Sequence, residues 1–426
     1  MKRASDLLKM LNSHELDGAA ASAQVACGGF STASERIESL VRLFIDKYGD
    51  RDCTIISVPG RTELGGNHTD HQRGRVLAAS VDMDILAVVS PCDEPRVRLS
   101  SVGFSREDDV DLTDLEPIEQ EKNHSPALIR GIARWFSDHS LPVRGFCAYT
   151  QSEVPSGSGL SSSAAFEVMA GAAFAAVGGV DVDPVDLAKA GQYAENVFFG
   201  KPCGLLDQTA CACGGVVAID FIDPTAPKVE RASLDLGKLG YALCITLTGG
   251  CHADLTDDYA AVPAEMKSVA RAFCQEELRG VDERAFYDAI PALREKVGDR
   301  AILRAMHFFD ENRRVEKLVG ALKGGDFDEY LRLVNESGNS SRNLLQNIFS
   351  PHATNDQGVS LALAISESAL GGKGACRVHG GGFAGTIQAY VPLDMVDGYR
   401  ATMNKYFGDG ACRVLAIRAK GPAVIA

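Results

Sequence analysis

Residues 60–74, GRTELGGNHTDHQRG, concentrate groups that could hold a small polar ligand. The stretch contains four glycines and two histidines, together with Arg61, Asn67 and Asp70. Glycine lets the backbone turn back on itself, and the side chains offer both hydrogen-bond donors and acceptors. His68 and His71 are three residues apart, but no third metal ligand is evident beside them, so the pattern favours a ligand-binding loop over a metal site.

A second stretch, PSGSGLSSSAA at residues 155–165, combines glycine and serine before a run of small residues that predicts a helix. The first turn of a helix offers free N–H groups and a partial positive charge, which together suit a phosphate group. Serine hydroxyls at such a turn can also bind Mg²⁺. The stretch lacks the Gly-Lys-Ser/Thr ending of a Walker A loop. A capped helix that packs closely through small residues explains the pattern equally well.

A third glycine cluster, HGGGFAG at residues 379–385, lies between two predicted strands. A hairpin turn with a bulge would also account for it.

The elements around these stretches predict a mixed fold. Apolar runs predict strands at 54–58 and 75–90, on either side of the first polar stretch, and a helical stripe covers 34–49 with Ser34 as its expected N-cap. Residues 260–370 are mainly helical in pattern. Because strands and helices do not alternate strictly, the pattern favours an α+β fold over a doubly wound sheet. The segment DPTAPK at 223–228 suggests two domains, 1–224 and 225–426.

Composition limits the possible partners and location. The chain has 426 residues and a net charge of −14, with no long Lys/Arg run, so we expect no nucleic-acid partner, and an anionic ligand must be held by local features. The N-terminus has no secretory apolar region and no apolar run is long enough to span a bilayer. The twelve cysteines include no C-x-x-C pair, which favours core thiols in a reducing compartment. We therefore expect a cytoplasmic protein without a membrane partner; its oligomeric state is left open.

Four segments, in order, resemble the GHMP small-molecule kinases, most closely the galactokinase branch. GRTELGGNHTDH resembles the sugar signature, SGSGLSSSAA the phosphate loop, AENVFFGKPCGLLDQ the segment with a magnesium glutamate and a catalytic aspartate, and VHGGGFAGT the C-terminal glycine motif. The resemblance implies an N-terminal α/β domain with the phosphate loop and a ferredoxin-like C-terminal domain. It also implies an ATP- and Mg²⁺-dependent sugar 1-kinase whose partners are the sugar and ATP.

The resemblance assigns roles residue by residue. It makes Asp207 the group that orients and deprotonates the sugar hydroxyl, and Arg61 the group that stabilises the transferring phosphoryl group. It implies Ser163 and Glu195 as Mg²⁺ ligands, and places Gly380–Gly382 across the cleft. The expected sugar-binding residues are Asn67, His68, Thr69, Asp70 and Tyr259, and the expected ATP-binding residues are Gly157, Ser158, Gly159, Leu160, Ser161, Ser162 and Ser163.

One departure leaves the sugar open. Galactokinases usually have GEHTDY where this chain has GNHTDH, so Asn67 replaces a glutamate that contacts the C6 hydroxyl. A neutral side chain would tolerate a C6 carboxylate, and HTDHQ is similar to the HxDHQ of plant galacturonate kinases. Galactose is therefore the first candidate substrate, and galacturonate or another C6-altered galactose-like sugar is the alternative. Some relatives only sense sugar and ATP, but the pair Ser163-Ala164, Asp207 and Arg61 is retained here, which favours catalysis.

Overall fold

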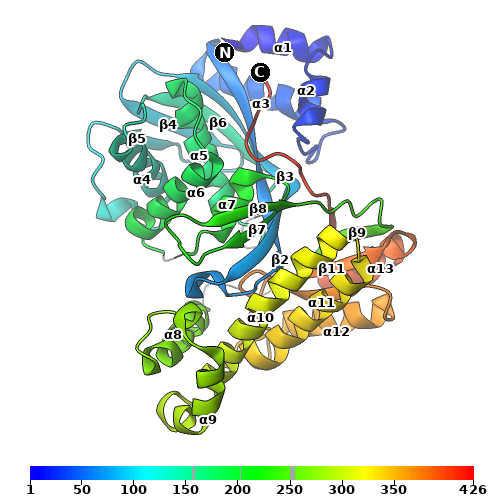
Figure 1. The fold of residues 1–426 in the computed structure, drawn as a ribbon. Helices are drawn as coiled ribbons and strands as arrows, with labels where there is room; N and C mark the ends of the chain where they lie inside the picture. Colours follow the sequence, from blue (N-terminus) through cyan, green and yellow to red (C-terminus); the bar gives the residue numbers. More distant parts are fainter. Residues whose placement is uncertain (156–158, 202, 250–254) are drawn as a thin grey trace.

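The computed structural model describes residues 1–155, 159–201, 203–249 and 255–426, and it contains two β-sheets (Figure 1). In the first sheet, two long antiparallel strands, β2 (Asp52–Gly65) and β3 (Arg75–Pro91), form the centre. The strand order is β1-β2-β3-β6-β4-β5, with β7 and β8 extending from one end of β3 and β13 pairing with β2. The other strands of this sheet are β1 (Lys2–Arg3), β4 (Arg96–Ser101), β5 (Asp108–Asp111), β6 (Phe146–Ser152), β7 (Val216–Asp220), β8 (Lys228–Ala232) and β13 (Ala423–Val424).

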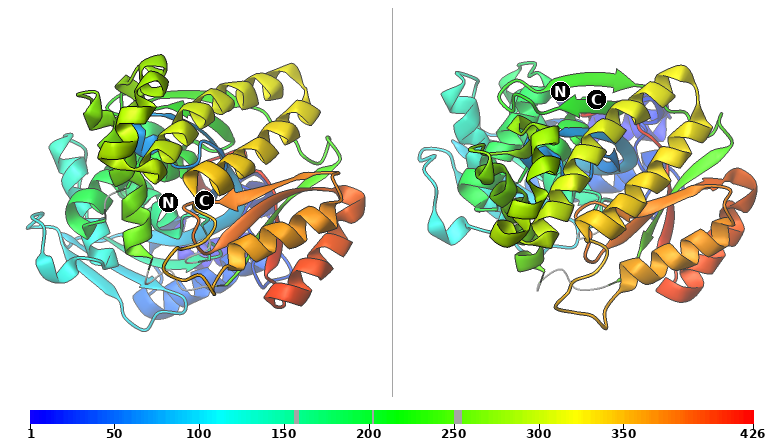
Figure 2. Two further views of the ribbon diagram at one scale, coloured as in Figure 1. Left: turned by 90° about the horizontal axis from the view of Figure 1, so that it is seen from below. Right: turned by 60° about the horizontal axis from the view of Figure 1, so that its bottom comes forward.

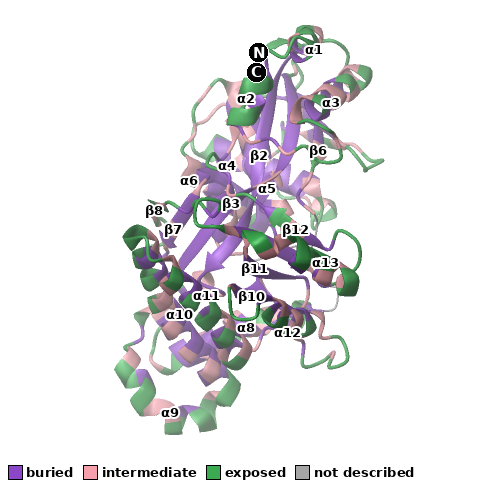
Figure 3. Ribbon diagram, turned by 90° about the vertical axis from the view of Figure 1, so that its right-hand side faces the viewer, coloured by how far each residue is buried: buried purple, intermediate pink, exposed green. Residues whose placement is uncertain are grey.

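Helices cover both faces of the first sheet, as Figure 1 shows. One face packs on α4 (Ser125–Asp138), α5 (Ser162–Gly178), α6 (Pro184–Tyr193) and α7 (Leu206–Cys213), and the other on α1 (Ala4–Asn12), α2 (Asp17–Ser22) and α3 (Ala33–Tyr48). Successive strand residues alternate between the two cores: Ile55 and Val88 face α3, whereas Ile56 and Val89 face α5. This double burial explains why both strands are rich in apolar residues on both faces, and Figure 3 shows them buried for most of their length.

The second sheet has four antiparallel strands in the order β10-β11-β9-β12. They are β9 (Tyr241–Leu247), β10 (Ala375–His379), β11 (Thr386–Pro392) and β12 (Cys412–Leu415). Counted along the chain, the order is fourth, first, third, second, with helices in the first and last connections, which is the ferredoxin-like arrangement. The predicted α+β class is therefore confirmed.

A long helical insertion joins β9 to β10. Its helices are α8 (Thr256–Ala272), α9 (Glu283–Val297), α10 (Asp299–Gly324), α11 (Phe327–Ser340) and α12 (Gly358–Leu370), and α13 (Val396–Phe407) follows β11. Figure 2 shows α10 and α11 lying side by side. Shorter helical turns are η1 (Asp70–Gln72), η2 (Glu119–Glu121), η3 (Ala194–Phe199), η4 (Leu278–Gly280), η5 (Ser341–Leu345) and η6 (Leu393–Met395), of which η3 and η5 are π-helical.

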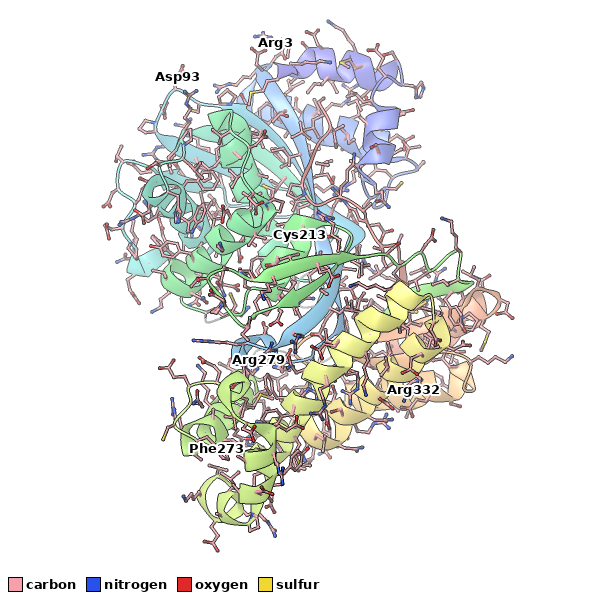
Figure 4. All side chains as sticks on the ribbon, in the orientation of Figure 1. Arg3, Asp93, Cys213, Phe273, Arg279 and Arg332 are labelled. Carbon is pink, nitrogen blue, oxygen red and sulfur yellow. The ribbon has the colours of Figure 1, made fainter. Side chains whose placement is uncertain are left out.

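Several contacts join the two halves of the chain. Arg279, labelled in Figure 4, lies between them and donates to Asp220 at the end of β7, with an Nη2–Oδ2 distance of 3.0 Å. The C-terminal tail returns to the first sheet, where Arg418 donates to the hydroxyl of Ser57 at 2.7 Å. Strands β8 and β13 belong to the first sheet although they follow residue 224. The division at 224/225 stays a prediction.

The helix predicted at 34–49 is observed at Ala33–Tyr48, but its N-cap is Thr32, whose side chain accepts from the N–H of Glu35 at 3.1 Å. The prediction of Ser34 was wrong because Ser34 already lies inside the first turn. In the part of the chain that the structure covers, no helix is long and apolar enough to cross a membrane.

Candidate active site

An ion pair between β2 and α7 lies where the predicted motifs meet. The Nε and Nη2 atoms of Arg61 lie 2.7 and 2.6 Å from Oδ1 of Asp207. The arginine side chain is 7% exposed, whereas that of Asp207 is 36% exposed, so the carboxylate remains open to a ligand. Charge-assisted bonds of this kind are among the stronger hydrogen bonds in proteins. The pair connects residues 146 positions apart and fixes the orientation of the aspartate.

Two helix N-termini converge on this pair. Ser161 immediately precedes α5 with a positive φ of 58°, and its hydroxyl donates to Oδ2 of Asp207. Asp207 itself lies in the first turn of α7, where the helix dipole stabilises a negative charge. Arg61 also donates through Nη1 to the carbonyl of Gly159 and through its backbone N–H to that of Leu160. Hydrogen bonds thus join the end of the predicted phosphate loop (159–161) and α7 to β2, the strand that leads into the predicted sugar loop (66–74).

The predicted sugar-loop residue Asp70 lies beside this centre. Burial, followed by the charge of Asp207, raises the pKa of Asp70 to about 6. A Cβ added to Gly204 would lie 1.8 Å from Oδ2 of Asp70, so glycine is needed there for the carboxylate to fit. The structure thus brings Arg61, Asp70, Ser161 and Asp207 together.

The side chains of His68, in the loop after β2, and Tyr259, on α8, both contact the C-terminal glycine turn at residues 380–382. The Nε2 of His68 lies 2.8 Å from the carbonyl of Gly381, and the hydroxyl of Tyr259 donates to that of Gly382 at 2.8 Å. A Cβ at Gly381 would approach the Tyr259 ring to 2.5 Å. Thr69 is fully buried, with its hydroxyl 2.9 and 2.7 Å from the carbonyls of Gly66 and Arg75, so its contacts belong to the loop itself.

Asn67 is only 1% exposed, and its amide has protein partners at every polar position. Nδ2 lies 3.2 and 3.3 Å from the two carboxylate oxygens of Glu63 and 2.7 Å from the carbonyl of Gly380. Oδ1 accepts from Asn347 at 2.8 Å and Ser341 at 3.3 Å. A sugar hydroxyl would have to displace one of these groups. The expected C6 contact stays a prediction, and the geometry favours a positioning role.

The predicted metal ligand Glu195 belongs to a buried polar cluster. Gln208 donates through Nε2 to Glu195 at 3.0 Å and to Glu167 at 2.9 Å, and Lys201 lies 3.1 Å from Glu195. Oε1 of Glu167 and Oε1 of Gln208 are buried without a hydrogen-bond partner among the described residues. Burial and the nearby Glu195 raise the pKa of Glu167 well above its usual value. Oxygen ligands of this kind suit Mg²⁺, but among the described residues no group of three or more His, Cys, Asp or Glu side chains could hold a metal ion, so the Mg²⁺ site stays a prediction. Ser163 lies in the first turn of α5.

The C-terminal glycine motif touches the phosphate-loop end directly. A Cβ on Gly380 would lie 3.6 Å from the Cα of Gly159, and one on Gly159, which has φ +73°, would meet Thr386 at 2.9 Å and His379 at 3.0 Å. His379 Nε2 accepts from the N–H of Glu63 at 3.2 Å, so that nitrogen carries no proton. Burial, with nearby arginine charges, lowers the pKa of His379 well below its usual value, consistent with a neutral ring. The placement of Gly380–Gly382 across the site is therefore consistent with these contacts.

Gly157 and Ser158 of the expected ATP site lie outside the described residues. Sequence reasoning did not assign Glu63, Gly204, Gln208, Arg377 or His379. Four of these stand within the quoted motifs, but only the fold shows which side chains they meet. Nothing in the sequence around Arg377 signals its partner Glu63, which is 314 residues away.

Comparison with known proteins decides the family. Residues 127–215 match the GHMP kinases N terminal domain, and residues 42–91 match the galactokinase galactose-binding signature. A galactokinase of Lactobacillus helveticus is 30% identical over 383 residues, which cover 87% of this chain and 94% of the relative. The chain belongs to the galactokinase family. This galactokinase-family chain is therefore a sugar kinase, a phosphotransferase that acts on a hydroxyl group, and the family implies ATP as its substrate.

Other relatives agree in sequence and fold. A galactokinase of Actinobacillus pleuropneumoniae serotype 5b (strain L20) is 28% identical over 358 residues, covering 84% of this galactokinase-family chain and 90% of the relative. The solved structure of Lactococcus lactis galactokinase complexed with galactose superposes with a TM-score of 0.77 at 22% identity, covering 91% of this chain and 99% of that one. Methanococcus jannaschii mevalonate kinase superposes with a TM-score of 0.62 at 14% identity, covering 86% and 98%. The predicted GHMP kinase fold is confirmed.

Gly204→Ala tests the contact between the sugar loop and the segment before α7. The new methyl group would displace Asp70, so kcat/KM for the sugar should fall at least ~10-fold, since small misplacements of positioning groups cost one to two orders of magnitude. Gly320→Ala in α10 is the matched control, because a Cβ there meets nothing within 4 Å. Steady-state kinetics on both variants makes the comparison; equal activity would show that Asp70 does not need this space.

Proposed function

We propose that this chain transfers the γ-phosphoryl group of ATP to the anomeric hydroxyl of galactose, giving galactose 1-phosphate and ADP. The observation that carries the proposal is the Asp207 carboxylate, held by Arg61 and Ser161 at the start of α5 and beside Asp70. The arrangement supports the proposal because it combines a fixed proton acceptor, a cation and a helix N-terminus around one open position.

Asp207 orients the attacking hydroxyl and accepts its proton. Its Oδ1 is turned toward Arg61 and its Oδ2 toward Ser161, so its rotation is restricted while more than a third of the side chain remains exposed to substrate. Arg61 stabilises the negative charge that spreads over the phosphoryl oxygens during transfer. The Arg61 side chain is only 7% exposed, so its guanidinium lies in a poorly hydrated setting, where its attraction to a negative charge is stronger than in water.

The phosphate groups of ATP would lie at the N-terminus of α5, where the first helical turn presents N–H groups and the helix dipole favours negative charge. Ser163 and Glu195 would hold Mg²⁺, with Glu167 and Gln208 as neighbouring oxygen donors. When bound, Mg²⁺ would supply positive charge that offsets the negative charge of the phosphate groups. Lys201 offsets the charge of Glu195 from the other side.

The sugar is held by the 66–74 loop. Asp70 accepts hydrogen bonds from two hydroxyls, His68 contributes a ring nitrogen, and Tyr259 closes the pocket from α8. The matches to the galactokinase galactose-binding signature and to curated galactokinases support galactose as the substrate that we propose.

Product analysis tests the function. Wild-type protein is incubated with ATP, Mg²⁺ and, in turn, galactose, galacturonate and glucose, and the product is followed by phosphorus NMR with ADP release as a second readout. We expect an anomeric 1-phosphate from galactose and slower turnover of the other two sugars. A 6-phosphate would contradict the proposal. If none of the three sugars supported ADP release, the proposal would also fail, and a protein that only senses sugar and ATP would be favoured.

The pH profile tests Asp70. Its carboxyl must be ionised to accept two hydroxyl hydrogens, and its pKa is raised to about 6. At saturating ATP and Mg²⁺, kcat/KM for galactose should therefore fall as the pH drops through about 6, and Asp70→Asn should remove this limb along with most of the activity.

Folding gives an independent readout of the same group. Because the folded pKa of Asp70 exceeds the unfolded value of ~3.9, the native state binds the proton more tightly. This group should therefore lower the free energy of unfolding as the pH rises from about 4 to about 6, a dependence that Asp70→Asn removes.

A wild-type pH–rate profile that stays flat down to pH 5 would show that Asp70 is not a sugar acceptor.

A further inference from the structure

The strand that leads into the sugar loop ends in a buried ion pair that the reaction does not use. Glu63, on β2, accepts from Nη2 of Arg377, on β10, at 2.5 Å. Glu63 is 5% exposed and Arg377 is not exposed at all. Nε and Nη1 of Arg377 have no hydrogen-bond partner among the described residues. Glu63 is thus the direct counter-ion of a buried cation in the other half of the molecule.

Asn67 is bonded to this pair in one orientation. Both oxygens of Glu63 lie within 3.3 Å of Asn67 Nδ2, and the carbonyl of Gly380 takes the other N–H. With Asn347 and Ser341 donating to Oδ1, turning the amide over would set donors against donors and acceptors against acceptors. The amide is therefore the group that fits beside Glu63, and a carboxylate in its place would face two negative oxygens.

Two side chains of α10 also bind the backbone of the sugar loop at Gly66 and Asn67. The N–H of Gly66 donates to Oε1 of Glu311 at 3.0 Å, and Nε2 of His307 donates to the backbone carbonyl of Asn67 at 2.9 Å. Glu311 pairs with Arg314 and accepts from Ser337 at 2.6 Å. His68 and Asp70 follow Asn67 directly, so the placement of Asn67 sets theirs.

We propose that Glu63 is a positioning residue of the sugar loop: paired with Arg377, it holds the amide of Asn67, and through it His68 and Asp70, and it requires position 67 to be uncharged. This inference rests on the proposed function for its link to the sugar. It assigns the negative charge beside Asn67 to position 63, and the counter-ion of that charge, Arg377, belongs to the C-terminal half of the chain.

An isosteric exchange tests the proposal. The four proteins are the wild type, Glu63→Gln, Asn67→Asp and the double variant Glu63→Gln/Asn67→Asp, which moves the carboxylate to position 67 without changing charge or size. Glu230→Gln is the control, because Glu230 also pairs across the two halves, with Lys323, but at 56% exposure. Urea unfolding without substrate and steady-state KM values for galactose and ATP are measured for each.

We expect Asn67→Asp to lower the folding equilibrium constant at least ~10²-fold, because two buried carboxylates would be in contact. The double variant should recover at least ~10-fold of that loss. The KM for galactose should rise at least ~10-fold in Asn67→Asp while the KM for ATP stays within about twofold, and Glu230→Gln should match the wild type.

Additive losses in the double variant would overturn the coupling. Equal changes in the two KM values would overturn the positioning role, since a general loss of structure would affect both substrates. If the wild type turned over no sugar, the proposed function would fail, while the unfolding measurements would still decide whether Glu63 sets the charge tolerated at position 67.

Discussion

The ion pair between Arg61 and Asp207 is the contact on which the rest of the site depends. It joins β2, the strand that carries the sugar loop, to α7, the helix that carries the aspartate, and Arg61 simultaneously binds the carbonyl of Gly159 at the end of the phosphate loop. One guanidinium therefore sets the relative positions of the three segments. Its planar geometry suits this task better than an ammonium group would, because several donors are fixed in one plane.

A buried polar junction supports this centre from behind. Glu63, Asn67, His307, Glu311 and Arg377 are all at most 5% exposed, and they connect the sugar loop to the C-terminal half. Such a junction is costly when one partner is removed, because a buried charge or donor is then left without compensation. The close approach of glycines at 159 and 380 brings the two halves together at backbone distance. The site is therefore buried around Asn67, whose amide is fully hydrogen-bonded, and open to solvent at Asp207.

Much of this could be predicted from the sequence, because local chemistry determined it. The strands on either side of the sugar loop are marked by runs rich in apolar residues, and the loop before α5 is marked by its glycine and serine content. That Arg61, Asp70, Ser161 and Asp207 belong to one site was implied by the resemblance to the GHMP kinases. The observed strands are longer than predicted, since β2 continues through the polar residues up to Gly65, where pairing with β3 satisfies the backbone. The neighbours of Asn67 could not be predicted, because Arg377, Ser341 and Asn347 are brought to it only by the fold.

The central claim is that Arg61 and Asp207 act as one unit, and a double-mutant cycle on kcat tests it most directly. Arg61→Met and Asp207→Asn are each expected to lower kcat for galactose at least ~10²-fold, the scale of losing a general base or a charge-stabilising group. If the two groups work together, kcat of the double variant should be no more than about threefold below kcat of the less active single variant, as for residues that act as a unit. Losses that multiply in the double variant would contradict the account, because they would mean that each residue contributes independently of the ion pair.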